Sequence, residues 1–462
     1  MKKYIKILSL VALSTLSVSC SEDSLDAVAT TLKPVDDVKN LNDVSMVVRG
    51  ALDRLSNQNY YGRSLLVYGE LYADNAYANG NSGRYLSIGS GRLTVTNDYV
   101  ANSWDVINKV ISSSNLAINK RISVSKEEEE QYNDLLGQAY FYRALAHFDL
   151  LRYWGQQNVE QGGLDALGVP YIKIFHPEGE TIEVKRESVR ENLKNLYSDL
   201  DEAIKLFGNN DKPNTFYANK WTAKALKARI ALYFKDYDQV LSNANEIINS
   251  GKYKVVGGED YVKSWKNPSS DNWLFAISYT TTDELGNESI STLYQNTGYG
   301  DIVLRKGLLN TIFDDSDIRG KSPMILKDVE NRRGEKWDRI YGKYPRTAPS
   351  VYSLPLFRYE EIILDKAEAL YYKNQKQEAI DLINNEICAN RNAKKLTDLS
   401  QDILIKEWRK EFLFEGMRFT TLTRNGLGIE SRKVPAGDFK LAFPIPRWDR
   451  NNNPNIEQNK GY

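Results

Sequence analysis

Three glutamates near the end of the chain could take part in acid/base or metal chemistry. The stretch Lys406–Arg424 is predicted to form one amphipathic helix that runs into a capped turn. At 100° per residue, Glu407, Glu411 and Glu415 fall on one stripe with Arg418. A column of carboxylates suits general acid/base catalysis or a divalent cation. It suits equally an ion-pair seam, in which cations from other helices neutralise the glutamates. We favour the seam, which predicts a helical scaffold and no catalytic residue.

The segment Asp134–Trp154 is a candidate to pack against this helix. It is apolar on most sides and rich in small residues, which predicts a buried, closely packed helix. Arg143 and Arg152 lie inside it and require acidic partners, and the glutamate stripe is a candidate to supply them. His147 is interpreted as a hydrogen-bonded core residue.

Two further pairs of helices are predicted, each joined by a short polar turn: Trp221–Phe234 with Tyr237–Ile248, and Tyr359–Tyr372 with Gln377–Ile387. A small residue on the first helix precedes an apolar residue on the second by twelve positions in each pair, Ala228 before Val240 and Ala367 before Ala379. This spacing resembles a tetratricopeptide unit. Gly137–Gly155 with Ser188–Phe207 is a further, interrupted unit. Because such units bury their faces by stacking, we expect a mainly α superhelix with a few short strands.

Long irregular segments interrupt the helical pattern. Helices are expected at Val35–Leu55, Leu65–Ala78 and Trp104–Ile118, but the segment 79–97 is rich in Gly, Ser and Asn and predicts a loop or hairpin. The segment 250–356 is longer and polar, with one predicted strand at Trp273–Thr280. Loops of this length are uncommon unless they are functional.

The first 19 residues have the features of a secretory signal. Three lysines precede a short apolar run, and Cys20 follows small residues, which indicates lipoprotein processing with Cys20 as the acylated residue. Residues 20–462 would then form one domain. No later run of 18 apolar residues occurs, so the lipid is the only membrane attachment that we expect.

Several motifs resemble the SusD/RagB family of outer-membrane lipoproteins. The C-terminal signature is Glu407-x-Arg409-x-Glu411-Phe412-x-Phe414-Glu415-Gly416-x-Arg418, followed by Arg424. Other matching stretches are RALAHFDLLRYWG at 143–155, GVPY at 168–171, DIR at 317–319, PLFRYEEIILDKAEAL at 355–370, LAFPIP at 441–446 and the final NPN, QN and GY. The resemblance is nearly full length and is poorest in the segments 79–97 and 250–356.

The resemblance implies a binding protein on the cell surface, and not an enzyme. Such proteins capture oligosaccharides and sit as a lid on a TonB-dependent outer-membrane barrel of the SusC type. Three alternatives remain open: a peptide cargo, as in the RagB branch; a tetratricopeptide adaptor that binds a protein tail; and a glycosidase, which needs two carboxylates in one cleft.

Composition excludes other classes of function. The 61 basic and 61 acidic side chains balance, which disfavours a nucleic-acid binder. Only two histidines occur, which disfavours a histidine-based zinc enzyme, and Cys388 is expected to be a small buried residue. Motifs for phosphate and calcium binding are incomplete at 314–323, so no metal and no cofactor is predicted.

The binding residues are expected on the two long loops. A sugar has apolar C–H faces on which aromatic rings can stack, and hydroxyls that Asn, Asp and Arg can bind. Loop residues of both types were selected by composition and placement: Tyr77, Asn79, Arg84 and Tyr85 from the first loop, and Tyr294, Tyr299, Trp337 and Tyr341 from the second.

Overall fold

The computed structural model describes residues 38–177, 183–267, 270–347 and 349–462. The predicted signal segment and Cys20 lie outside these residues. Residues 40–462 form one compact unit. Within the described part of the chain, no helix combines the length and the apolar character that a membrane span requires.

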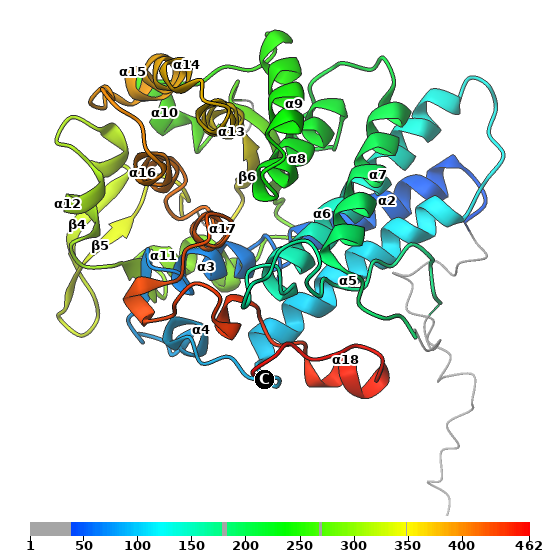
Figure 1. Ribbon diagram of the computed structural model, residues 1–462, viewed down its shortest axis with the longest axis horizontal. Coiled ribbons are helices and arrows are strands. Elements are labelled where there is room, and N and C mark those ends of the chain that lie inside the picture. Colours follow the sequence, from blue (N-terminus) through cyan, green and yellow to red (C-terminus); the bar gives the residue numbers. More distant parts are fainter. Residues whose placement is uncertain (1–37, 178–182, 268–269, 348) are drawn as a thin grey trace, which may run out of the picture. The chain divides into compact units, whose positions relative to one another are not determined.

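The long helices pack in chain order, each against the next (Figure 1). They are α2 (Leu41–Leu55), α5 (Asp98–Asn119), α6 (Glu129–Trp154), α7 (Val189–Phe207), α8 (Lys220–Tyr233), α9 (Tyr237–Asn249) and α13 (Tyr359–Tyr372). The last of these continues into α14 (Lys376–Leu382), a π-helical turn (Ile383–Cys388) and α15 (Ala389–Arg391). The predicted mainly α, tetratricopeptide-like superhelix is therefore confirmed.

The predicted helix pairs owe their close approach to small side chains. Ala228, Val240, Ala367 and Ala379 are all completely buried. Asn219 caps the start of α8, and its side-chain oxygen accepts hydrogen bonds from the backbone N–H groups of the first turn. Such caps satisfy backbone donors that have no partner inside the helix. The pairing α8–α9 and α13–α14 was thus predictable from spacing alone.

The arginines of α6 find partners other than the predicted glutamate stripe. Arg143 forms a bidentate ion pair with Asp199 of α7, at 2.6 and 2.8 Å. Arg152 pairs with Asp149, one turn earlier on its own helix, at 2.7 Å. The prediction was wrong because two carboxylates lie nearer to these arginines: Asp199 on the neighbouring helix α7, and Asp149 on α6 itself.

The stretch Lys406–Arg424 is not one helix. It forms the end of α16 (Gln401–Glu411) and all of α17 (Arg418–Arg424), with a turn between them. Gly416 in this turn has φ +79°, and a side chain there would collide with Leu66 of α3 (Ser64–Leu71). Glu70 fixes the turn, because its carboxylate accepts the backbone N–H of Gly416 at 2.8 Å. This long-range contact interrupts a helix that the local periodicity favours.

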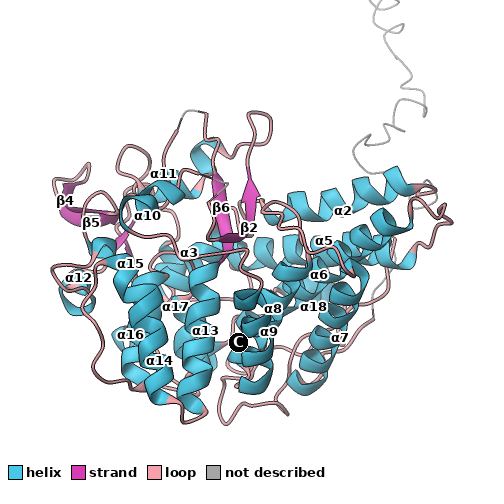
Figure 2. Cartoon of the chain, turned by 90° about the horizontal axis from the view of Figure 1, so that it is seen from above, coloured by secondary structure: helices cyan, strands magenta, loops and turns pink. Residues whose placement is uncertain are grey.

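In the part of the chain that the structure describes, three small antiparallel sheets complete the fold, and Figure 2 labels their strands β2, β4, β5 and β6. The predicted strand is confirmed as β2 (Trp273–Ser278), which pairs with β6 (Ser353–Arg358). The other pairs are β1 (Ala76–Ala78) with β3 (Ile302–Leu304), and β4 (Ile325–Glu330) with β5 (Lys336–Ile340). Tyr77 therefore lies on a strand, and the helix predicted at 65–78 ends at Leu71. Short helices are α4 (Leu86–Ser90), α10 (Gly258–Ser264), α11 (Ile290–Tyr294), α12 (Leu308–Ile312) and α18 (Arg447–Asn452).

Candidate functional site

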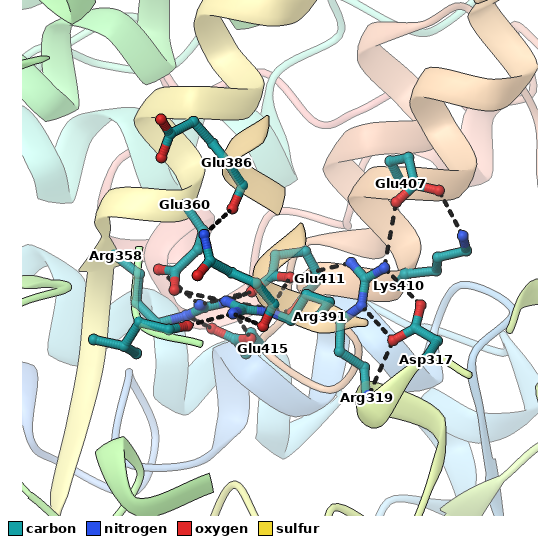
Figure 3. Close-up of polar contacts among 12 residues, drawn as sticks. Asp317, Arg319, Arg358, Glu360, Glu386, Arg391, Glu407, Lys410, Glu411 and Glu415 are labelled. Carbon is teal, nitrogen blue, oxygen red and sulfur yellow. Dashed lines mark hydrogen bonds and ion pairs between the residues drawn. The ribbon is translucent and has the colours of Figure 1, made fainter. Parts of the chain in front are cut away.

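The glutamates of α16 and the following turn belong to a buried ion-pair cluster (Figure 3). Its carboxylates are Asp317, Glu360, Glu407, Glu411 and Glu415, and its cations are Arg319, Lys343, Arg358, Arg391 and Lys410. Five negative and five positive groups balance, and none of these side chains is more than 8% exposed. The seam interpretation is confirmed, although Arg418 pairs instead with Asp74 at 2.6 Å.

Glu411 is the centre of the cluster. Its carboxylate accepts from Arg391 at 2.9 and 3.0 Å, from Arg358 at 3.0 Å and from Arg319 at 3.1 Å. Burial alone would raise the pKa of Glu411, but the three guanidinium groups hold it well below its usual range. A carboxylate with a depressed pKa and three cationic partners is a poor general base. Among the described residues, no group of three or more His, Cys, Asp or Glu could hold a metal ion.

The two irregular segments predicted to bind ligand lie against each other. Asn79 N–H donates to the carbonyl of Asp301 at 2.9 Å, which extends the β1–β3 pairing into the first loop. Ser82 N–H donates to the Asp301 carboxylate at 2.7 Å. Arg333, in the β4–β5 turn, donates to the carbonyl of Gly80 at 2.8 Å. We call residues 77–84, 299–306 and 333–341 together the two-loop surface.

An aromatic pair lies on the two-loop surface. The rings of Tyr77 and Trp337 are stacked, with their centroids 5.2 Å apart and their planes 16° apart. Tyr77 is 46% exposed, so much of its ring faces solvent. Lys306 places its ammonium 4.6 Å from the centre of the Trp337 ring. The indole N–H is directed to Glu335, 3.3 Å away. The arrangement offers the exposed part of the Tyr77 ring as an aromatic face, with Lys306 and Glu335 nearby.

A second aromatic group lies near the same loops. The guanidinium carbon of Arg84 lies 3.8 Å from the centre of the Tyr299 ring, and Arg84 also pairs with Glu288 at 2.9 Å. Both Arg84 and Tyr299 are half-buried. Tyr341 is 44% exposed and follows β5 directly. Five of the eight predicted residues therefore present surface to solvent: Tyr77, Arg84, Tyr299, Trp337 and Tyr341.

The other three predicted residues are buried and cannot contact a ligand directly. Tyr85 is completely buried, stacks on Tyr99 and accepts a hydrogen bond from Arg63 at 2.9 Å. Tyr294 is completely buried against Phe414 and Tyr344. Asn79 donates its side-chain amide to the Gly300 carbonyl at 2.9 Å. Neighbouring residues enclose these three side chains or form hydrogen bonds with them, so they hold the loops in place.

Sequence reasoning missed the other five cations in the ranges of the two-loop surface: Arg305, Lys306, Arg333, Lys336 and Arg339. Arg339 lies between Trp337 and Tyr341 on the strand, and it is 1% exposed. Its Nη1 donates to the Gly300 carbonyl at 3.0 Å, and burial lowers its pKa to about 10. Strand alternation places positions 337, 339 and 341 on one face, and this signal could have identified Arg339.

A pocket of about 440 Å³ lies away from the two-loop surface. It is formed where α6, α8 and α17 end, together with the segment 436–441. None of the eight predicted residues lines it. The sequence offered no motif for this pocket, because its walls come from four separate segments.

Fold and sequence comparisons agree on one family. A SusD-like family model, described as starch-binding and associating with the outer membrane, matches residues 18–232, and the model of the SusD family matches residues 336–462. The chain belongs to the SusD/RagB family. The resemblance that the motifs indicated is therefore confirmed, and the family is one that associates with the outer membrane.

Individual relatives extend this result. SusD-like protein P38 of Formosa agariphila is 24% identical over 92% of each chain. The starch-binding protein SusD of Bacteroides thetaiotaomicron is 31% identical over 29% of this chain and 25% of its own. Among solved structures, a putative sugar-binding protein of Bacteroides vulgatus is 26% identical with a TM-score of 0.80, and a SusD superfamily protein of the same species is 24% identical with a TM-score of 0.83. Each alignment covers 92% of this chain and 99% of the other.

Proposed function

We propose that the protein captures glycans at the cell surface and that the two-loop surface contacts them. The observation that carries this proposal is the stacked pair Tyr77–Trp337, with Tyr77 46% exposed and the Lys306 ammonium over the Trp337 ring. A pyranose ring has an apolar C–H face that stacks on such a ring, while its hydroxyls bind polar groups beside it. Family membership supports the same cargo, because the family model is described as starch-binding.

The test is binding of the mature protein to a panel of polysaccharides, by affinity gels and calorimetry. Tyr77→Ala and Trp337→Ala should each weaken binding at least about tenfold, because each removes part of the stacking face. Tyr217→Ala is the matched control, since Tyr217 is 37% exposed but lies outside the two-loop surface. Equal binding by all three variants would refute this placement of the site.

Oligopeptides form the second arm of the same experiment. The RagB branch carries peptides, whereas the names of SusD and of the putative sugar-binding protein point to starch and sugar. We therefore expect glycan binding and no saturable binding of oligopeptides. The reverse result would assign a peptide cargo and leave the fold unchanged.

We propose that the protein acts by binding alone. Glu411, the most central carboxylate, is held ionised by three arginines and is completely buried, so it has neither the protonation nor the access that a glycosidase acid requires. A bound glycan should keep its length after prolonged incubation, as measured by chromatography. Cleavage that is lost in a carboxylate variant would overturn this proposal.

We propose further that the cargo passes to a SusC-type, TonB-dependent barrel. The support is family membership and the outer-membrane association of the family. The two proteins should co-purify from detergent-solubilised outer membranes. A protein that is recovered only as a free monomer, with no barrel after mild cross-linking, would favour the tetratricopeptide adaptor instead.

Cys20 is the proposed lipid anchor on the outer face of the membrane. The Cys20→Ser variant should lose incorporation of labelled fatty acid and appear in the soluble fraction. Protease added to whole cells should digest the wild-type protein if it faces outward. Incorporation of label into Cys20→Ser would refute this assignment.

A further inference from the structure

The pocket at the ends of α6, α8 and α17 has a volume of about 440 Å³. This lies within the range of roughly 300–1,000 Å³ that is typical of small-molecule sites. Its walls come from the segment after α6 (Gln157–Leu164), the end of α8 (Tyr233–Lys235), the end of α17 (Thr423–Leu427) and the segment 436–441. It shares no residue with the two-loop surface.

Its polar groups are mainly neutral amides and hydroxyls. Asn158 and Gln157 both donate side-chain N–H bonds to the hydroxyl oxygen of Tyr233, at 2.8 and 3.0 Å. Two donors occupy the oxygen of Tyr233, and among the described residues no acceptor takes its own proton. The Oε1 of Gln157 also has no hydrogen-bond partner in the described part of the chain, but this atom is fully enclosed beside Gly155, so a ligand in the pocket does not reach it. The wall therefore holds one donor, the Tyr233 hydroxyl, that remains to be satisfied.

Apolar surface accompanies these groups. Phe234 is half-buried and meets the Tyr233 ring edge-on, with centroids 5.0 Å apart. Leu427 is 37% exposed at the pocket, and Leu164 and Leu441 line it as well. An apolar wall beside amides and a hydroxyl suits a molecule that carries both C–H faces and hydroxyls.

The charges at the pocket are largely compensated. Arg424 is engaged by both oxygens of Glu368, and Glu160 pairs with Lys460. Lys235 is the one lining cation that forms no ion pair within the described residues. A site with one exposed lysine at its edge and neutral amides within does not select for an anion. The polar character therefore favours an uncharged ligand.

We propose that this pocket is a second binding site, for a short neutral saccharide. The Tyr233 hydroxyl donates to a sugar oxygen, and the Phe234–Leu427 wall covers a C–H face. The site is separate from the two-loop surface, so its occupancy does not depend on the proposed function of that surface.

The test is calorimetric and ligand-observed NMR titration with neutral mono- and disaccharides: glucose, galactose, mannose, xylose, maltose and cellobiose. The protein used is the full mature chain carrying Trp337→Ala, which removes the aromatic pair of the two-loop surface. At least one of these sugars should bind, and Leu427→Arg should weaken its binding at least about tenfold by filling the pocket. Ile174→Arg, at a 65% exposed position outside the pocket, is the matched control and should bind as the parent does.

Tyr233→Phe provides a second, chemical test. It keeps the ring and removes the hydroxyl, so binding should fall at least about fivefold from loss of one hydrogen bond. This variant also leaves the side-chain amide of Asn158 without its acceptor, whereas Gln157 keeps its hydrogen bond to the Leu151 carbonyl at 2.8 Å. If Tyr233→Phe unfolds, Leu427→Arg decides the test. Binding of none of the six sugars, or binding that Leu427→Arg leaves intact, would overturn the proposal. Saturable binding of glucuronate or sulfate without any neutral sugar would also overturn it.

Discussion

Arg319 and Glu411 are 92 residues apart in the sequence, and Arg319 Nη1 donates to Glu411 Oε2 at 3.1 Å. Arg319 belongs to the long segment between β2 and β6, whereas Glu411 ends α16 of the helical scaffold. Arg358 and Arg391 bind the same carboxylate, at 3.0 and 2.9 Å. One buried carboxylate therefore joins the irregular segment to the scaffold, which fixes the base of the loops that we assign to ligand binding.

Glu411→Gln should lower the free energy of unfolding by about 3–5 kcal/mol, because it leaves three buried guanidinium groups short of one negative charge. Denaturant titration measures this change. Asp105→Asn is the control, since it breaks the exposed Lys109–Asp105 pair and should cost less than about 1 kcal/mol. Similar losses in the two variants would show that the cluster contributes no more than a surface ion pair.

Gly69→Ala should destabilise the protein by several kcal/mol. A Cβ at Gly69 would lie 1.9 Å from the carbonyl oxygen of Gly416, so α3 or the turn after α16 would have to move. The matched control is Gly50→Ala inside α2, where the new methyl meets only the flexible tip of Arg54, at 3.3 Å. That variant should gain about 0.5–1 kcal/mol from helix propensity. Thermal unfolding compares the two, and a stable Gly69→Ala protein would contradict the close approach.

Asp449 on α18 should make the stability of the folded protein vary with pH in the mildly acidic range. Burial raises its pKa to about 6, and a hydrogen bond from the Trp104 indole at 2.9 Å opposes that rise in part. The folded state therefore binds a proton that the unfolded chain releases at lower pH, so stability falls as pH rises from about 4 to about 6. Asp449→Asn should gain about 1 kcal/mol at pH 7 and little at pH 4. An equal gain at both values would contradict this account.

His147 should remain neutral in the folded protein down to about pH 4. Burial lowers its pKa to about 3, and the ring stacks on Tyr171 with centroids 3.8 Å apart. Its Nε2 accepts from the Ile172 N–H at 2.9 Å, so Nδ1 carries the proton and donates to the Arg143 carbonyl.

Because the unfolded chain takes up a proton near pH 6.5 and the folded one does not, His147 contributes a loss of stability as pH falls from about 6.5 toward 3. NMR of the imidazole nitrogens reads the tautomer directly. His147→Gln should lower stability at pH 7 and flatten this acid dependence. A ring that titrates near pH 6 while the protein stays folded would refute the buried, neutral assignment.

Local sequence patterns were sufficient to predict the helical scaffold. The twelve-residue spacing of Ala228 with Val240 and of Ala367 with Ala379 predicted both helix pairs, and all four residues are completely buried. Helical periodicity and side-chain size are properties of neighbouring residues, so the chain displays them before it folds. The family motifs likewise depend on short runs of sequence.

Contacts between distant segments decided the rest. The turn that separates α16 from α17 exists because Gly69 and Glu70 of α3 lie against Gly416, and no residue near 416 reveals that neighbour. The same holds at the candidate site, where Tyr77 and Trp337 were selected by type, but only the pairing of β1 with β3 and the fold of the β4–β5 hairpin bring their rings together.

The sequence by itself therefore determined the class of scaffold and the kinds of residue that the loops carry. Only the tertiary structure decided that Tyr85 and Tyr294 are buried while Tyr77 and Tyr341 remain exposed. The physical reason is that burial of an aromatic side chain depends on what packs over it, and the covering residue can be distant in sequence: Phe414, which packs on Tyr294, lies 120 positions away.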